Sequence, residues 1–184
     1  MLEATANEAL TFDLGPDTPF SYRCNACSRC CHHKIIQISP YEIVRLARGL
    51  GLTTTEFIAR YTTEGGTVLR RRPEDDAACV FLSAQGCSVH PDRPLVCRIY
   101  PLGAAISPDG TLAYLQLEPE PGTEGEYGAD GTIAGYVAQQ GVPQMRVAIA
   151  PYKRLYHRVA EILAALDASS LEHAGNASLA LAEM

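Results

Sequence analysis

The sequence predicts a small α+β fold of short helices, a β-hairpin and a C-terminal helix around an irregular region. Two helix-capping signals, each followed by apolar residues at helical spacing, predict the first helices. A Ser-Pro-Asp-Gly turn between two apolar stretches predicts the hairpin. Seven cysteines lie among turn residues and prolines, so we expect that part of the chain to be largely irregular.

Composition and charge limit the classes of function. The chain has 184 residues, 47% of them hydrophobic, which is enough to bury a core. Its formal net charge of −6 argues against nucleic acid as the main partner, because phosphate binding needs surplus Lys and Arg. No apolar run approaches the roughly 20 residues of a membrane helix, and residues 1–12 show no secretory signal. We therefore expect a cytoplasmic protein that does not enter a membrane.

The first half of the chain carries the clearest local signals. Residues 1–20 are expected to be an extended lead-in, with Phe20 and Tyr22 packing beside a cysteine loop. Capping boxes at Ser39 and Thr53 open two helices. We expect these helices at 40–49 and 54–63, followed by a strand at 67–72. Its arginine run, Arg70 to Arg72, is expected on a solvated face, with an anion or partner site as the alternative.

The second half is predicted from turns and periodicity. In order, we expect a hairpin at 104–117, a Gly-rich surface loop at 118–131, a short helix at 133–140 and a long helix at 143–166. One domain is expected over residues 1–167. The tail at 168–184 is Ala- and Ser-rich, and we expect it to be weakly structured.

The cysteine loop is the strongest chemical signal. Cys24, Cys27, Cys30 and Cys31 fall within eight residues in a polar stretch, where core packing does not call for thiols. In a reducing cytosol such a pattern favours metal binding over disulfides, and seven cysteines cannot all pair within one chain. Thiolates prefer zinc, copper(I) or iron–sulfur clusters.

The remaining cysteines are expected to complete the site. Cys79, Cys87 and Cys97 lie close together in the sequence. His90 follows Cys87 by three residues, a spacing that allows both to bind one metal ion. The C-x-x-C-x-x-C run is shared with bacterial ferredoxin segments, where a remote cysteine completes a 4Fe–4S cluster. Zinc stays open, since four sulfurs also make a structural zinc site. The predicted metal residues are Cys24, Cys27, Cys30, Cys31, Cys79, Cys87, Cys97 and His90.

Several details of this site have two interpretations. Adjacent residues tend to point in different directions, so one of Cys30 and Cys31 is expected to serve the cluster and the other a second site or the core. Cys31 is therefore either a ligand or a buried, uncoordinated thiol. Five cations flank the cysteines and either support a thiolate-rich site or make ordinary surface ion pairs. They are Arg23, Arg29, Lys34, Arg93 and Arg98. His32 and His33 are weaker ligand candidates than His90.

Taken together, these motifs resemble the YkgJ-type cysteine-cluster family, which is described as a zinc- or iron-chelating domain. The resemblance covers roughly residues 20–103 and is carried by C-x-x-C-x-x-C-C at 24–31, Gly-Cys-Ser-Val-His at 86–90 and Arg-Pro-x-x-Cys-Arg-x-Tyr-Pro at 93–101. The family commonly has Gly where this chain has Ser28, so Ser28 must reach a positive φ or the loop must differ. The resemblance implies a metal-binding protein.

Three functions remain open at this stage. The first is a metal-binding protein that holds an iron–sulfur cluster or zinc. The second is an enzyme that uses the cluster, for example in modifying a protein side chain, although no nucleophile–base pair or carboxylate pair is evident. The third is a thiol redox protein with switchable disulfides. The sequence names no protein partner.

Overall fold

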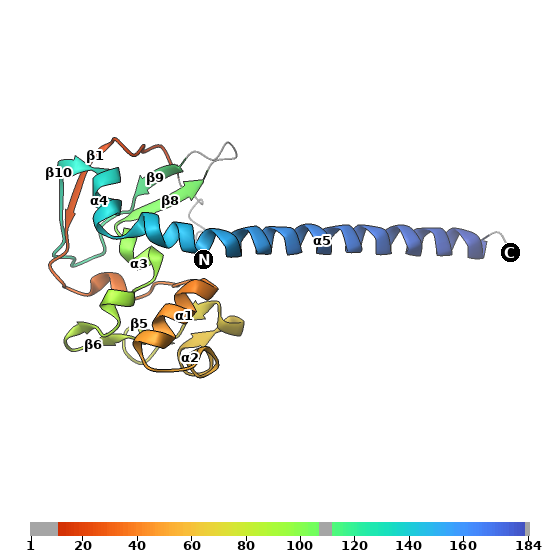
Figure 1. Cartoon of the computed structure of the whole chain (residues 1–184), viewed down its shortest axis with the longest axis horizontal. Coiled ribbons are helices and arrows are strands. Elements are labelled where there is room, and N and C mark those ends of the chain that lie inside the picture. The colour runs from red at the N-terminus through yellow and green to blue at the C-terminus, as the bar shows by residue number, and fades with distance from the viewer. Residues whose placement is uncertain (1–10, 107–111, 183–184) are drawn as a thin grey trace, which may run out of the picture. The chain divides into compact units, whose positions relative to one another are not determined.

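The computed structural model describes residues 11–106 and 112–182 (Figure 1). It confirms the α+β class: short helices, small antiparallel strand pairs and a C-terminal helix. The chain divides into two compact units, Met1–Met145 and Arg146–Met184. All seven cysteines lie in the first unit. The division into a domain at 1–167 and a tail at 168–184 stays a prediction.

The longest strand pairing joins the N-terminal region to a segment expected to be loop. β1 (Pro19–Arg23) runs antiparallel to β10 (Glu126–Thr132), and the two lie side by side in Figure 1. The prediction of a surface loop throughout 118–131 is therefore wrong from Glu126 onward. This pairing anchors the segment that enters the cysteine loop, because β1 ends directly before Cys24.

Close packing explains the glycines that made β10 look like a loop. A Cβ atom on Gly125 would lie 2.1 Å from the Tyr22 hydroxyl oxygen, and one on Gly128 would lie 2.6 Å from Oγ of Ser21. Neither distance is possible between real atoms, so β1 side chains occupy the space that β10 leaves free. Gly in this strand reflects a near neighbour rather than a turn.

A hairpin and a helix complete the first hydrophobic cluster. β8 (Leu102–Ile106) pairs with β9 (Leu112–Gln116), which confirms the predicted hairpin, while its turn lies outside the described residues. The predicted short helix is α4 (Ile133–Gln139). The buried members of this cluster are Phe20, Ile99, Leu102, Tyr114, Ile133, Tyr136, Val137 and Val142.

Two capped helices build the second cluster. α1 (Pro40–Gly49) and α2 (Thr54–Tyr61) begin at complete capping boxes, as predicted. α2 ends at Tyr61, two residues before the predicted end. Their apolar faces bury residues that also contact the later cysteine segment. The buried members are Ile38, Leu46, Ala47, Phe57, Leu69, Phe81 and Val89, and partly buried Cys79 and Cys87 pack against them.

Between these clusters the chain forms very short elements. The two-residue strands pair as β2 (Thr62–Thr63) with β3 (Val68–Leu69), β4 (Arg71–Arg72) with β5 (Ala78–Cys79), and β6 (Leu82–Ser83) with β7 (Gly86–Cys87). The 3₁₀ turns are η1 (Arg29–Cys31), η2 (Glu64–Gly66) and η3 (His90–Asp92). The one short α-helix here is α3 (Leu95–Ile99). Elements this short need hydrogen bonds from side chains to hold them in place.

The C-terminal helix is longer than expected. α5 (Val142–Ala182) includes the predicted helix at 143–166 and continues through residues 168–182. It contains Pro151. Within the ranges that the structure describes, none of the helices combines the length and apolar character needed to cross a membrane.

Candidate metal centre

The cysteine loop turns sharply between β1 and η1. Ser28 caps η1 with φ of 61° and ψ of 6°, in the left-handed region, and Ala26 has φ of 56°. Side chains with a Cβ atom adopt this conformation at a cost. Of the two possibilities for Ser28, the structure shows the positive φ. The turn brings Cys27, Cys30 and Cys31 round from the end of β1.

Replacing Ser28 by Gly is expected to stabilise the protein by about 1 kcal/mol, because Gly reaches a positive φ without steric cost. The hydroxyl contributes little, since its contact with the Ala26 carbonyl oxygen is 3.5 Å long. Ser28→Ala is the matched control and should not gain stability. Denaturant unfolding of metal-loaded protein measures both; equal stability of the two variants would contradict the backbone explanation.

Cys27 accepts hydrogen bonds from the segment just before β10. The Glu124 N–H donates to Sγ at 3.4 Å, and the Thr123 hydroxyl oxygen lies 3.7 Å from Sγ. Burial raises the pKa of Cys27, but the hydrogen bonds from the Glu124 and Arg29 N–H groups and from Thr123 outweigh it, so the pKa is lowered overall. Backbone N–H groups that donate to sulfur stabilise the negative charge of a metal-bound thiolate.

The thiols of Cys30 and Cys31 interact with each other, although adjacent residues tend to point in different directions. A hydrogen bond from the Cys31 thiol is the main cause that lowers the pKa of Cys30 to about 7. The same bond and burial raise the pKa of Cys31, and the nearby thiols of Cys79 and Cys87 raise it further. Cys31 therefore faces the later cysteines.

Three separate elements carry the later cysteines, whose thiols lie near that of Cys30. Cys79 ends β5, Cys87 ends β7 and is opposite Leu82, and Cys97 lies in α3. Burial raises the pKa of Cys97 to about 12, with further contributions from the thiols of Cys79, Cys30 and Cys87. Burial also raises the pKa of Cys79. Five thiols, including Cys31, thus share one neighbourhood.

These thiols are near one another without forming a coordination shell. Across residues 11–106 and 112–182, no three Cys, His, Asp or Glu side chains already stand in an arrangement that would hold a metal ion. Each of the seven cysteines is a free thiol. The donor set nevertheless has the chemistry of a soft-metal site: several sulfurs, partly buried, with N–H donors and cations beside them.

Cys24 and His90 occupy different surroundings. Cys24 is exposed. Burial raises the pKa of Tyr22 to about 12, and the neighbouring Cys24 contributes to the rise. Tyr22 therefore packs beside the cysteine loop, as expected. Nδ1 of His90 lies 3.2 Å from a guanidinium nitrogen of Arg93, and burial followed by the charges of Arg93 and Arg98 lowers the pKa of His90. Its place among the ligands stays a prediction.

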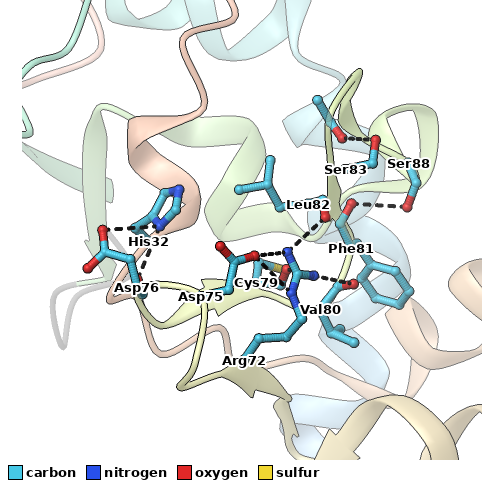
Figure 2. Close-up of polar contacts among 11 residues, drawn as sticks. His32, Arg72, Asp75, Asp76, Cys79, Val80, Phe81, Leu82, Ser83 and Ser88 are labelled. Carbon is cyan, nitrogen blue, oxygen red and sulfur yellow. Dashed lines mark hydrogen bonds and ion pairs between the residues drawn. The ribbon is translucent and has the colours of Figure 1, made fainter.

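His32 and His33 face an acidic turn. Nδ1 of His32 lies 3.1 Å from the Asp76 carbonyl oxygen and 3.6 Å from Oδ2 of the same residue, as Figure 2 shows. Nε2 of His33 lies 3.0 Å from the other carboxylate oxygen, Oδ1. His32 also forms a β-bridge with Ala78, the neighbour of Cys79. Both histidines therefore hold the end of the cysteine loop to the segment that carries Cys79.

Arg72 anchors the turn between Cys79 and Leu82. Its guanidinium donates to the carbonyl oxygens of Cys79 at 3.0 Å, Val80 at 3.1 Å and Leu82 at 3.1 Å. It also donates twice to Oδ2 of Asp75, at 2.6 and 3.1 Å (Figure 2). The solvated face predicted for the arginine run is therefore wrong at Arg72, whose side chain is only 31% exposed.

The hairpin of β6 and β7 is fixed from its other side. Ser88 donates from its backbone N–H and its hydroxyl to the Phe81 carbonyl oxygen, at 2.9 and 3.0 Å. The Ser83 hydroxyl donates to the Gly86 carbonyl oxygen at 2.8 Å across the turn from β6 to β7, and Ser88 directly follows β7 (Figure 2). Arg72 and these serines together hold Cys79 and Cys87 in register.

The arginines near Cys97 bind backbone rather than carboxylates. Arg98 donates to the carbonyl oxygens of Arg93 at 3.0 Å and of Gln140 at 3.1 Å, and also to that of Pro91. Arg93 donates to the side-chain oxygen of Gln140 at 2.6 Å. These bonds tie η3 and α3 to the end of α4. The charge of Arg93 partly offsets the rise that burial causes in the pKa of Cys97.

Glu42 links α1 to the helix that carries Cys97. Its Oε2 accepts from the Ser39 N–H and hydroxyl, both at 2.7 Å, which is the predicted capping box. Its Oε1 accepts from the Leu95 N–H at 2.6 Å, at the start of α3. Glu42 is only 4% exposed. One buried carboxylate thus caps two helices. The local sequence predicts the cap at Ser39 but not the one at Leu95.

Glu42→Gln is expected to lower the free energy of unfolding by about 2 kcal/mol, because charge-assisted hydrogen bonds are stronger than neutral ones and the site is buried. Glu56 supplies the matched control. Its carboxylate accepts the same two bonds from Thr53, both at 2.9 Å, but is exposed and reaches no second helix. Denaturant unfolding should show a loss several times smaller for Glu56→Gln; similar losses would contradict the two-helix role.

Comparison with known proteins identifies the family. The profile of the CxxCxxCC family, described as a "Putative zinc- or iron-chelating domain", matches residues 23–118 of the 184. The match begins before Cys24 and extends past Cys97, so it includes every cysteine of the chain. Comparisons with curated proteins and with solved structures found no match. Since the matched segment spans more than half of the sequence and carries the whole thiol set, this protein belongs to the CxxCxxCC family of chelating domains.

Proposed function

We propose that this protein holds an iron–sulfur cluster, with zinc as the second candidate, through the cysteine loop and the three later cysteines. The observation that carries the proposal is the shared neighbourhood of five thiols from four separate elements. They are Cys30, Cys31, Cys79, Cys87 and Cys97. Cys24, Cys27 and His90 complete the set of candidate ligands.

The electrostatics of the thiols support a bound cation. Burial raises the pKa values of Cys79 and Cys97 despite the opposing charges of Arg72 and Arg93, so their thiolates are unfavourable without a further positive charge. A metal supplies that charge and deprotonates coordinating thiols. Cys27 already receives N–H donors, and Lys34 lowers the pKa of Cys30. The surroundings of Cys27 and Cys30 thus favour thiolates in the protein alone, whereas thiolates at Cys79 and Cys97 need a bound cation.

The spacing of the loop favours iron–sulfur over zinc. Cys24, Cys27 and Cys30 are each separated by two residues, which is the spacing of the cysteine run in bacterial ferredoxins. A structural zinc site is satisfied by four thiolates. A cluster would supply electron transfer when bound, whereas zinc would supply only a structural link. Either group would draw together elements that are too short to be stable alone.

The number of free thiols favours a reducing compartment. Seven cysteines are present and all are free in the structure. Thiols this close together form disulfides under oxidising conditions, and metal-binding cysteines are typical of the cytosol. We propose that the protein works in the cytoplasm. Its presence in a cytosolic cell fraction, loaded with metal, would support this location.

Anaerobic purification followed by metal analysis tests the proposal. Stoichiometric iron and acid-labile sulfide, with broad visible absorption that bleaches on reduction, would support the cluster. Colourless protein with one zinc per chain would support the second candidate and overturn the first. Protein that is free of metal, fails to bind iron or zinc in reconstitution and still unfolds cooperatively would overturn both.

A further inference from the structure

The metal site leaves one prominent surface unexplained, on helix α5. Six apolar residues line one side of it and are called the α5 stripe: Tyr152, Leu155, Tyr156, Val159, Ile162 and Leu163. Five of them are strongly exposed, from 42% at Val159 to 59% at Leu155. Large apolar side chains exposed in a row indicate an interaction surface.

The α5 stripe is a continuous face. At about 100° per residue, its six positions fall within an arc of about 120°. They follow the spacing of three and four residues that lets one helix pack along another. The charged residues Arg154 and Glu161 fall on the opposite side of the same turns, and Arg158 flanks the stripe. This division between faces is the pattern of a helix that packs against another element.

Contacts within α5 link Glu161 to two neighbouring residues on the polar side of the helix. Arg158 lies 3.2 Å from one carboxylate oxygen of Glu161, and Nδ1 of His157 lies 3.8 Å from the other. Pairs at this spacing contribute only a few tenths of a kcal/mol each. Long helices in water obtain most of their stability from packing of an apolar face. The charged face therefore does not account for the stability of α5.

The charge distribution along α5 indicates what packs there. Between positions 146 and 158 the charged residues are basic: Arg146, Lys153, Arg154 and Arg158. From 159 to 182 the sequence has Glu161, Asp167 and Glu172 and no Lys or Arg. Two copies of this helix placed antiparallel bring each basic half beside the partner's acidic half. A parallel arrangement brings like charges together, and antiparallel helix dipoles add to the preference.

We propose that α5 is a dimerisation helix, which pairs antiparallel with α5 of a second copy through the α5 stripe. Val159 lies near the middle of the stripe, so the pairing is self-complementary and closes as a twofold dimer. Leu155 of one copy then faces the acidic-half end of the stripe on the other, where Ile162 and Leu163 lie. This association is independent of the metal site and does not require it.

Sedimentation of the full-length chain in reducing buffer tests the pairing. The wild-type protein should be a dimer, and the double variant Leu155→Glu/Ile162→Glu should weaken dimerisation by at least about tenfold, because it buries charge in an apolar seam. Ala164→Glu is the matched control, since position 164 is exposed on the opposite side of the helix. It should remain dimeric. Helical content by circular dichroism and metal per chain should be unchanged in both.

The orientation has its own readout. An antiparallel pair held partly by opposite charges should dissociate more readily as salt is raised, because salt screens exposed charges. Dimerisation that strengthens with salt would overturn the antiparallel arrangement. A monomeric wild-type protein, or a control variant that weakens dimerisation as much as the double variant, would overturn the proposal as a whole. Loss of metal without loss of the dimer would leave it intact.

Discussion

Replacing Cys97 by Ser is expected to reduce bound metal from stoichiometric to near zero and to leave the protein unable to unfold cooperatively. Cys97 lies in α3, which packs in the first hydrophobic cluster through Leu95 and Ile99. Its thiol interacts with those of Cys30, Cys79 and Cys87. Metal binding at thiolate sites supplies folding free energy on the order of 10 kcal/mol. Metal analysis and thermal unfolding measure the two effects.

The same helix provides the control for this experiment. Val96 is the neighbour of Cys97 in α3 and is 43% exposed. Val96→Ser introduces the same side chain one position away and should retain metal and stability. Cys24→Ser and Cys27→Ser are expected to lose metal as well. Full metal content in all three cysteine variants would contradict the assignment of these residues as ligands.

Arg72→Lys is expected to lower the free energy of unfolding by about 3 kcal/mol and to weaken metal retention. The guanidinium makes five hydrogen bonds, three of them to carbonyl oxygens in the turn that follows Cys79. A lysine ammonium has three donors on one nitrogen and cannot reach the same set of acceptors. Carbonyl groups left without donors in a part-buried turn carry most of the cost.

Arg71 is the matched control for Arg72. It lies in the same strand, β4, but its side chain is exposed on the other face. Arg71→Lys should change the free energy of unfolding by less than about 0.5 kcal/mol. Denaturant unfolding with metal analysis compares the two. Equal and small effects would show that the turn after Cys79 is held by something other than Arg72.

Local signals in the sequence were enough to predict the capped helices. The capping boxes at Ser39 and Thr53 each involve residues three apart, so the sequence contains the complete interaction. The thiol spacing of the cysteine loop is likewise local, and it led to the family that the comparison confirms. Elements whose partners lie within one turn of chain are predictable from sequence in this protein.

Interactions between distant residues were not predictable in the same way. Glu42 satisfies its local box and also caps α3, and only the folded chain brings Leu95 to it. In the sequence Arg72 is one member of an arginine run that is expected to be exposed. In the structure it is partly buried, because it binds carbonyl oxygens of the turn at Cys79. The sequence did not reveal β10, because Gly125 just before it and Gly128 within it make room for Tyr22 and Ser21, which lie more than a hundred residues earlier.

The support that Cys27 receives from Thr123 and Glu124 has a consequence for how this domain can be divided. Both residues lie beyond the segment 23–118 that matches the family, as does β10, the partner of β1. A fragment cut to the family limits would keep every cysteine and lose the Glu124 N–H donor to Cys27. The chelating segment is therefore not a portable module: transplanted into another protein, it would need residues 119–132 as well.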